Sequence, residues 1–409
     1  MVDCVPTGVY LYPWDIAGDE LAADRVAAMG VDSVVLAAAY HAVRAVTPRH
    51  PRHRIVTAAE AAVYFPLDPL DWQGARVRPA EFPHDHDSFG SAVDAVRAAG
   101  PRVRAWVVLM HNATVGARHP DLVVRNAFGD RYPWALCPSH PEVVQYAVSV
   151  ARSAACRPGV SGIELESCGW YGVGHGSSHD KVSGIPASGI DEVLMSLCFC
   201  TACAAAYGAT GIDAVELRRR VTGGLAARFS HDLDTNEQGA GLAGVLGSAL
   251  AAQVVAVRSE VADSLRRQVV AGVREATSPG FEVLLQADPR ETATGANVGV
   301  DWAAAAADVD GLVLSCAGPI DTVAQRIRAA RLSSAGRART VASHQAVAGL
   351  AGTARELDDR VRATVRAGAD EVVLYHAGLA SASDLARMAE MIADRAVAPT
   401  PDGAADGHG

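Results

Sequence analysis

The chain has 409 residues, half of them hydrophobic, with a formal net charge of -10 at pH 7 and a pI near 5.8. Its 36 lysine and arginine residues are scattered, which argues against a nucleic-acid or anionic-membrane partner, because such partners need clustered cations. Eight cysteines are too dilute for a disulfide scaffold, so a reduced, cytoplasmic protein is expected.

The termini and the longest uncharged run carry no targeting signal. The N-terminus, MVDCVPTGVYLY, lacks a basic region followed by an apolar one, so no secretory signal is predicted. Residues 241–257 are uncharged but are broken by glycine, serine and glutamine, which indicates a buried helix of a soluble protein and no membrane span. Residues 398–409 are predicted to be a polar, flexible tail.

Short apolar, β-branched runs alternate with helical patterns rich in alanine and arginine. Eight runs are predicted as strands buried on both faces: 8–13, 32–38, 103–110, 160–166, 281–287, 310–316, 339–344 and 370–376. Helical patterns between and after them include 21–29, 141–155, 320–335, 354–368 and 383–397. This alternation predicts an α/β protein in which residues 1–397 form a single (β/α)8 TIM barrel.

Two connections are enlarged, residues 47–87 after the second strand and 170–277 after the fourth, the latter holding a cysteine-containing helical insertion. An open doubly wound sheet is the alternative fold. Such a sheet normally carries G-x-G-x-x-G after its first strand, whereas the turn here is YPWDIAGDE. The barrel is therefore the better prediction.

Polar and aromatic residues close nearly every predicted strand, and in these barrels function lies at the carboxyl ends of the strands. In chain order they are Tyr12, Trp14 and Asp15; Tyr40 and His41; His111 and Asn112; Glu164 and Glu166; Gln286 and Asp288; Ser315; His344 and Gln345; Tyr375 and His376. Flat rings beside hydrogen-bonding groups suit a sugar ring. The alternative is that the rings only cap the barrel mouth.

The fourth strand, GIELE, carries two glutamates on one face. Side chains alternate along a strand, so Glu164 and Glu166 point into the barrel, with Glu166 at the rim and Glu164 one layer below. Two carboxylates roughly 6 to 7 Å apart along a strand repel when both are ionised, which raises one pKa and suits general-acid catalysis. The alternative is that Glu164 is a structural group held by an arginine or by backbone.

A glycosidase needs a second carboxylate across the sugar from the acid. The best candidate on another strand is Asp288, which shares its face with Gln286, although a carboxylate before Pro289 also fits an ordinary turn. Asp15 is a weaker candidate, because it fits an N-terminal helix cap equally well.

The loop after the fourth strand, WYGVGHGSSHDK, brings Trp170, His179 and Lys181 beside the predicted site. Lys181 is the only lysine of the chain, which points to a place where an ammonium is needed and a guanidinium is not. The alternative is that Lys181 lies on a surface loop by chance and has no role in the site. No strand end carries a lysine, so a Schiff-base aldolase is disfavoured.

The segment SLCFCTAC places Cys198, Cys200 and Cys203 within six residues. Three thiolates at this spacing fit one structural zinc, with Cys168, Cys137 or His179 as the fourth ligand. Reduced cysteines packed in a helix are the alternative, because the second paired knuckle of a zinc ribbon is absent.

The order of these motifs resembles uncharacterised glycoside-hydrolase-like (β/α)8 barrel proteins of actinobacterial type. The resemblance covers residues 8–397 and rests on an aromatic first strand end, W-x-x-L-x-H-N on the third strand, I-E-L-E on the fourth, C-x-C-x-x-C in the insertion and Y-H-x-G-L on the eighth. The cysteine segment is also similar to the zinc-binding element of some barrel β-galactosidases, to which Cys198, Cys200 and Cys203 would correspond.

Neither of two related mechanisms transfers whole. The largest clan of retaining glycosidases places the acid after an asparagine and a nucleophilic glutamate on the seventh strand. Here Ile163 and Leu165 precede the glutamates, and the seventh strand ends in SHQ. Chitinase-like barrels carry D-G-x-D-x-D-x-E on the fourth strand, where this chain has Ser161 at the first acid and Cys168 at the last.

The sequence thus predicts a barrel that hydrolyses a glycosidic bond, with Glu166 as general acid and Asp288 or Glu164 as base or nucleophile. The expected sugar-binding residues are Tyr12, Trp14, Tyr40, His41, His111, Asn112, Trp170, His179, Lys181, Gln286, His344, Tyr375 and His376. The expected partner is a small carbohydrate, a homo-oligomer is compatible with the sequence, and catalysis requires no cofactor. A sugar-binding barrel without turnover and a metal-assisted lyase or isomerase stay open as alternatives.

Overall fold

The structure, a computed structural model, describes residues 5–83, 85–174, 181, 189–230, 241–347 and 357–397. Eight parallel strands form a closed barrel, because β15 pairs with β1 at one end of the strand order and β1 pairs with β2 at the other. The barrel strands are β1 (Thr7–Leu11), β2 (Ser33–Tyr40), β7 (Arg102–Val108), β10 (Gly162–Glu166), β11 (Glu282–Asp288), β13 (Gly311–Ser315), β14 (Arg339–Gln345) and β15 (Glu371–Tyr375). The predicted (β/α)8 barrel of the α/β class is confirmed.

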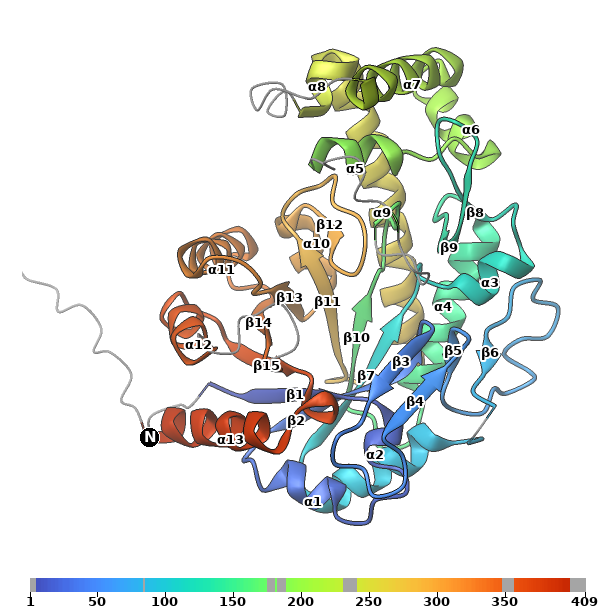
Figure 1. The fold of residues 1–409 in the computed structure, drawn as a ribbon. Helices are drawn as coiled ribbons and strands as arrows, with labels where there is room; N and C mark the ends of the chain where they lie inside the picture. Colours follow the sequence, from blue (N-terminus) through green and yellow to red (C-terminus); the bar gives the residue numbers. More distant parts are fainter. Residues whose placement is uncertain are drawn as a thin grey trace, which may run out of the picture.

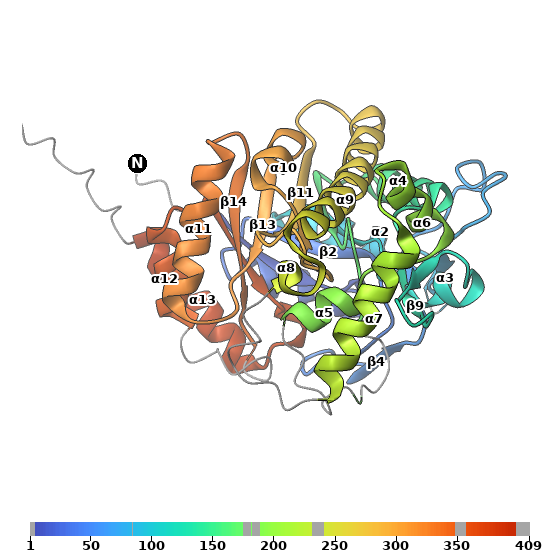
Figure 2. The ribbon, with the colours of Figure 1, turned by 90° about the horizontal axis from the view of Figure 1, so that it is seen from above.

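Helices surround the barrel and cover the outer face of its strands (Figures 1 and 2). They are α1 (Ala22–Ala27), α2 (Ser88–Ala99), α4 (Pro141–Ala155), α9 (Ser248–Ala276), α10 (Trp302–Asp308), α11 (Ile320–Ser334), α12 (Leu357–Arg366) and α13 (Ala382–Val397). The main core lies between strands and helices. Strands such as GIELE and SVVLAAAY are buried along their whole length, as expected for strands covered on both faces.

The connections at the carboxyl ends of the strands carry further small elements. After β2 come β3 (Val43–Val46), β4 (Ile55–Ala58), β5 (Ala62–Val63) and β6 (Ala80–Glu81), and after β7 come α3 (Ala113–Arg118), β8 (Val123–Arg125) and β9 (Arg131–Leu136). The turns η1 (Pro13–Asp15) and η4 (Ala377–Leu379) follow β1 and β15, and β12 (Val298–Gly299) pairs in parallel with the end of β11. The β8–β9 hairpin had no counterpart among the sequence predictions.

The connection after β10 contains α5 (Gly189–Met195), α6 (Thr201–Ala209), α7 (Ala214–Ser230) and α8 (Gly241–Leu246). Helices α5, α7 and α8 gather at the start of the long helix α9 (Figures 1 and 2). The predicted tail, residues 398–409, lies outside the described residues. Within the described part of the chain, no single helix has the length and apolar composition to cross a membrane, and only the pair α5 and α6, bent by 99°, meets those criteria jointly.

Charged side chains fill the amino-terminal end of the barrel interior. Arg104 on β7 pairs with Glu371 on β15, with Nη1 and Oε2 3.1 Å apart. These strands are not neighbours, so the ion pair crosses the interior. Arg339 joins the same group by contacting Glu371 at 3.1 Å and Glu282 at 2.9 Å. Side chains two and four residues further along these strands therefore also face inward.

Candidate active site

A cavity of about 340 Å³ lies at the carboxyl ends of the barrel strands. Every barrel strand contributes a side chain to it. The lining residues are Tyr10, Tyr40, His41, Trp106, His111, Glu166, Tyr171, Gln286, Ala296, Asn297, Ser315, Ser343, Gln345 and Tyr375. Two other cavities, of about 250 and 570 Å³, are lined by none of the predicted site residues.

Glu166 is the only carboxylate among the described residues that line this cavity. Its side chain is 6% exposed, and Oε2 accepts a 2.7 Å hydrogen bond from Nε1 of Trp106. The pKa of Glu166 is raised from 4.5 to about 7, mainly by burial; the charge of Glu164 acts in the same direction and the bond from Trp106 opposes both. A carboxyl group with a pKa near 7 is protonated in about half of the molecules at neutral pH and suits general-acid catalysis.

Glu164 lies beneath the cavity and does not line it. Its side chain is fully buried, and Oε1 accepts hydrogen bonds from the Tyr10 hydroxyl and, at 2.8 Å, from Nε2 of Gln286. Burial raises the pKa of Glu164, although Arg104, Tyr10 and Gln286 all favour its ionised form. The inward direction predicted for both glutamates matches these contacts, and the arginine anticipated as a structural partner lies close enough to act electrostatically.

Four rings that contact one another in succession, at interplanar angles of 30°, 31° and 21°, lie along one side of the cavity. The ring centroids are 4.1 Å apart between Tyr40 and His41, 4.4 Å between His41 and His111, and 4.4 Å between His111 and Tyr171. The rings come from the loops and strand ends after β2, β7 and β10, so the wall joins three separate βα units. Aromatic side chains beside hydrogen-bonding groups suit a sugar.

Among the predicted sugar-binding residues, the structure brings some into the cavity and not others. Those that line it are Tyr40, His41, His111, Gln286 and Tyr375. The prediction missed Trp106 and Tyr10, whose rings lie 4.9 Å apart on the cavity floor. Alternation was the signal that could have found Trp106, because it lies two residues after Arg104, a charged residue that must face the interior of the barrel.

Three of the predicted residues serve local structure beside the cavity. Asn112 caps α3 by accepting a hydrogen bond from the Val115 amide at 2.8 Å. Tyr12 is buried between Trp14 and His376, with ring centroids 4.6 and 4.4 Å away. The ring of His376 accepts a 3.1 Å hydrogen bond from the Gly378 amide and caps η4.

His344 and Trp170 point away from the cavity. Nε2 of His344 lies 3.0 Å from the Thr364 hydroxyl on α12, so this side chain faces the helix layer, whereas Ser343 and Gln345 face inward. Trp170 donates a 2.8 Å hydrogen bond from Nε1 to the carbonyl of Arg258 on α9.

Asp288 lies at the end of β11 but outside the cavity lining. Both of its carboxylate oxygens are 2.9 Å from the guanidinium of Arg290, which is a bidentate ion pair. Lys181 is exposed, and His179 lies outside the described residues.

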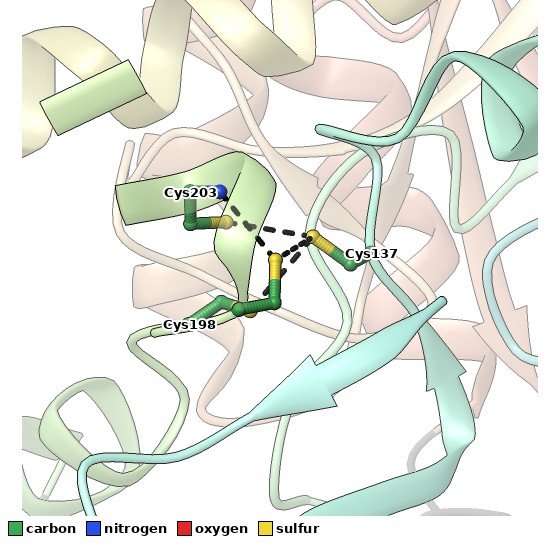
Figure 3. A group of neighbouring side chains, drawn as sticks. Cys137, Cys198 and Cys203 are labelled. Atoms are coloured by element: carbon green, nitrogen blue, oxygen red, sulfur yellow. Dashed lines mark hydrogen bonds between the residues drawn. The ribbon is translucent and has the colours of Figure 1, made fainter. Parts of the chain in front are cut away.

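A second candidate site is a cluster of four buried cysteines, Cys137, Cys198, Cys200 and Cys203 (Figure 3). Cys137 follows β9, and the other three lie before and at the start of α6. The three predicted ligands therefore meet, with Cys137 as the fourth member, and Cys168 is not part of the group. The cluster ties the β8–β9 hairpin to the insertion after β10.

The geometry of this cluster fits a tetrahedral divalent metal. Four metal–sulfur bonds of about 2.3 Å place the sulfur atoms about 3.8 Å apart, and the Sγ atom of Cys137 lies 3.7, 3.5 and 3.8 Å from those of Cys200, Cys203 and Cys198. Backbone amides also point at sulfur, from Cys203 to Cys200 at 3.4 Å and from Arg125 to Cys198 at 3.3 Å.

The sequence matches no protein-family model and no curated protein. Its fold is similar to the α-L-fucosidase isoenzyme 2 of Paenibacillus thiaminolyticus, with 12% identity, a TM-score of 0.57, and coverage of 95% of this chain and 49% of that one. The PgaB (BpsB) glycoside hydrolase domain from Bordetella bronchiseptica shows 16% identity, a TM-score of 0.55 and coverage of 97% and 100%.

A third similar structure is the β-galactosidase of the psychrophilic Marinomonas ef1, with 14% identity, a TM-score of 0.56 and coverage of 95% of this chain and 59% of that one. The chain thus spans about half of the fucosidase and all of the PgaB domain. At these identities the similarity shows a shared barrel fold with glycoside hydrolase domains, and the chemistry has to be argued from the site itself.

Proposed function

We propose that this chain hydrolyses a glycosidic bond of a small carbohydrate, with Glu166 as the general acid. The observation that carries the proposal is one buried carboxyl group with a pKa of about 7 in a cavity walled by aromatic rings and amides. The shared fold with glycoside hydrolase domains supports the same class of reaction but does not supply the residues.

Glu166 would donate its proton to the oxygen of the scissile bond. The N–H of Trp106 occupies Oε2, so the acidic proton is carried by Oε1. Bond cleavage turns the acid into a carboxylate, and the Trp106 hydrogen bond strengthens as that charge develops. Trp106 is therefore proposed to hold the acid in position and to stabilise it after proton transfer.

We propose that Glu164 acts through Glu166 and does not touch the sugar. Its full burial below the cavity leaves no path for direct attack, whereas its charge raises the pKa of Glu166. It would also stabilise the positive charge that develops on the sugar ring above it. Asp288 is the second carboxylate that the sequence predicts, but its ion pair with Arg290 would have to break before it could act as base or nucleophile.

The cavity wall is proposed to bind the sugar. The ring column of Tyr40, His41, His111 and Tyr171 offers aromatic surface. Hydrogen-bonding groups for hydroxyls come from the side chains of Gln286, Asn297, Ser315, Ser343 and Gln345. This combination is typical of sites that recognise neutral sugars.

The cysteine cluster is proposed to bind a structural zinc. Four thiolates would complete a closed tetrahedral site, and such sites stabilise the fold while leaving no open position for catalysis. When bound, the metal would hold together two segments that flank the cavity, the β8–β9 hairpin and the start of α6.

A sugar-binding barrel without turnover is the second candidate. It is favoured by the observation that Glu166 stands alone as a carboxylate in the described cavity lining. Calorimetric binding of an oligosaccharide with no product after long incubation would select it over the enzyme.

The first experiment measures release of chromophore from a panel of aryl α- and β-glycosides by wild type, Glu166→Gln and, as a matched control, the exposed Glu291→Gln. We expect Glu166→Gln to lose about 10²- to 10⁴-fold in rate on sugars with poor leaving groups, and less on activated aryl glycosides, which need little acid assistance. Full activity of Glu166→Gln on poor leaving groups would contradict the assignment.

A further inference from the structure

Arg258 on α9 is a buried arginine that has no carboxylate partner among the described residues. It is 2% exposed, and its Nε and Nη2 atoms have no hydrogen-bond partner in the part of the chain that the structure describes. Two buried arginines in the described residues are paired with carboxylates, Arg104 with Glu371 and Arg266 with Asp263 and Asp308. Because burying an unpaired cation is costly, we expect a source of negative charge near Arg258.

The groups that act on Arg258 electrostatically are sulfur and phenol groups. Burial lowers the pKa of Arg258, and Tyr207, Cys203, Cys198 and Cys137 oppose that effect. Tyr207 is neutral at ordinary pH, since burial raises its pKa above the usual value of 10. The cysteines can supply negative charge when they bind a divalent metal as thiolates.

Contacts fix the guanidinium beside the segment that leads into the cluster. Nη1 donates a 3.3 Å hydrogen bond to the carbonyl of Ser196, two residues before Cys198. The ring centre of Trp170 lies 4.4 Å from the guanidinium carbon. These two contacts hold Arg258 beside the segment that leads to Cys198.

We propose that Arg258 is the counter-charge of a divalent metal bound by the thiolates of Cys137, Cys198, Cys200 and Cys203. Four thiolates and one divalent cation leave a buried centre with a net charge of about -2, and the guanidinium reduces the local sum to about -1. Arg258 is therefore a positioning residue of the metal site, and this inference rests on the metal binding proposed above.

The proposal makes the sign of the Arg258 effect depend on the metal. With metal bound, the guanidinium is attracted to the anionic centre, so replacing it weakens the site. Without metal the guanidinium keeps only the Ser196 carbonyl and the Trp170 ring as its contacts among the described residues. An uncharged side chain of similar length should then be tolerated or even stabilising.

The test measures binding of Co²⁺, whose thiolate complexes absorb visibly, by wild type and Arg258→Met in competition with a chelator. We expect Arg258→Met to bind Co²⁺ about 10- to 100-fold more weakly, as is typical when a group behind the ligands is removed. The matched control is Arg266→Met, a buried arginine of the same helix with carboxylate partners of its own. It should lose stability and keep its Co²⁺ affinity within a few-fold of wild type.

Thermal unfolding with Co²⁺ and with chelator supplies the second readout. Arg258→Met should lower the melting temperature of the metal-loaded protein and leave that of the metal-free protein equal or raised. Equal Co²⁺ affinity, or equal destabilisation with and without metal, would overturn the proposal and make Arg258 a packing residue. If wild type binds no Co²⁺, the proposed metal site is wrong, and the inference about Arg258 that rests on it is wrong as well. Should Arg258→Met not fold, Arg258→Gln, which keeps a donor for Ser196, replaces it in both measurements.

Discussion

Replacing Glu166 by glutamine should stabilise the protein at alkaline pH while it removes the acid. The carboxyl has an ordinary pKa of 4.5 in the unfolded chain and about 7 in the folded protein. Between these two values the folded state binds more protons, so the stability of wild type falls as the pH rises through that window. Glutamine cannot ionise, and its oxygen still accepts the hydrogen bond from Trp106.

The magnitude follows from the two pKa values. They differ by about 2.5, and each pKa unit corresponds to about 1.36 kcal/mol, so wild type carries a cost of about 3 kcal/mol above pH 7. Urea unfolding of Glu166→Gln and wild type should show a gain of about 3 kcal/mol near pH 8 that shrinks to well under 1 kcal/mol near pH 4. The exposed control Glu291→Gln should show no such trend. A gain that does not change with pH would refute the reasoning.

Three further outcomes test the site. Glu164→Gln removes the charge that raises the pKa of Glu166, and Trp106→Phe removes the hydrogen bond that lowers it. The alkaline limb of the pH–rate profile should therefore move to lower pH in Glu164→Gln and to higher pH in Trp106→Phe. A shift of both variants in the same direction would contradict these roles. Asp288→Asn should retain activity within about tenfold if the carboxylate only pairs with Arg290, whereas a loss of 10²-fold or more would assign it the second catalytic role. Removal of metal by a chelator, or Cys198→Ser, should lower the free energy of unfolding by about 3 kcal/mol or more, as measured by denaturant unfolding with and without added zinc.

The barrel and the inward direction of Glu164 and Glu166 were predictable because they depend on local periodicity. Runs such as GIELE are apolar on one face and carry their charges on the other, so alternation alone points both glutamates inward. What alternation along one strand does not give is the contact across the barrel. The bond from Tyr10 on β1 to Glu164 on β10 depends on closure of the sheet, and no spacing in the sequence encodes it.

A strand end alone does not tell which of two adjacent side chains points into the barrel, because side chains alternate along a strand. His344 and Gln345 were both expected in the site, but only one can point inward. Arg339 at the start of β14 points inward, so Gln345, six residues later, points inward as well, and His344 points toward α12. A charged residue at the amino-terminal end of a barrel strand therefore shows which alternate side chains point inward, because that residue has to pair inside the barrel.

The loop after β10 connects the two candidate sites through three successive residues. Tyr171 ends the ring column of the cavity, Trp170 covers Arg258, and the carbonyl of Gly172 accepts a 2.9 Å hydrogen bond from Trp134 on β9. Glycine is required at position 172 because a Cβ there would lie 2.0 Å from the hydroxyl of Ser196. Ser196 in turn binds Arg258 and precedes the cysteines. A metal that fixes the cysteine cluster would therefore also fix the wall beside Glu166, which is how a site built on loops attains the rigidity that catalysis needs.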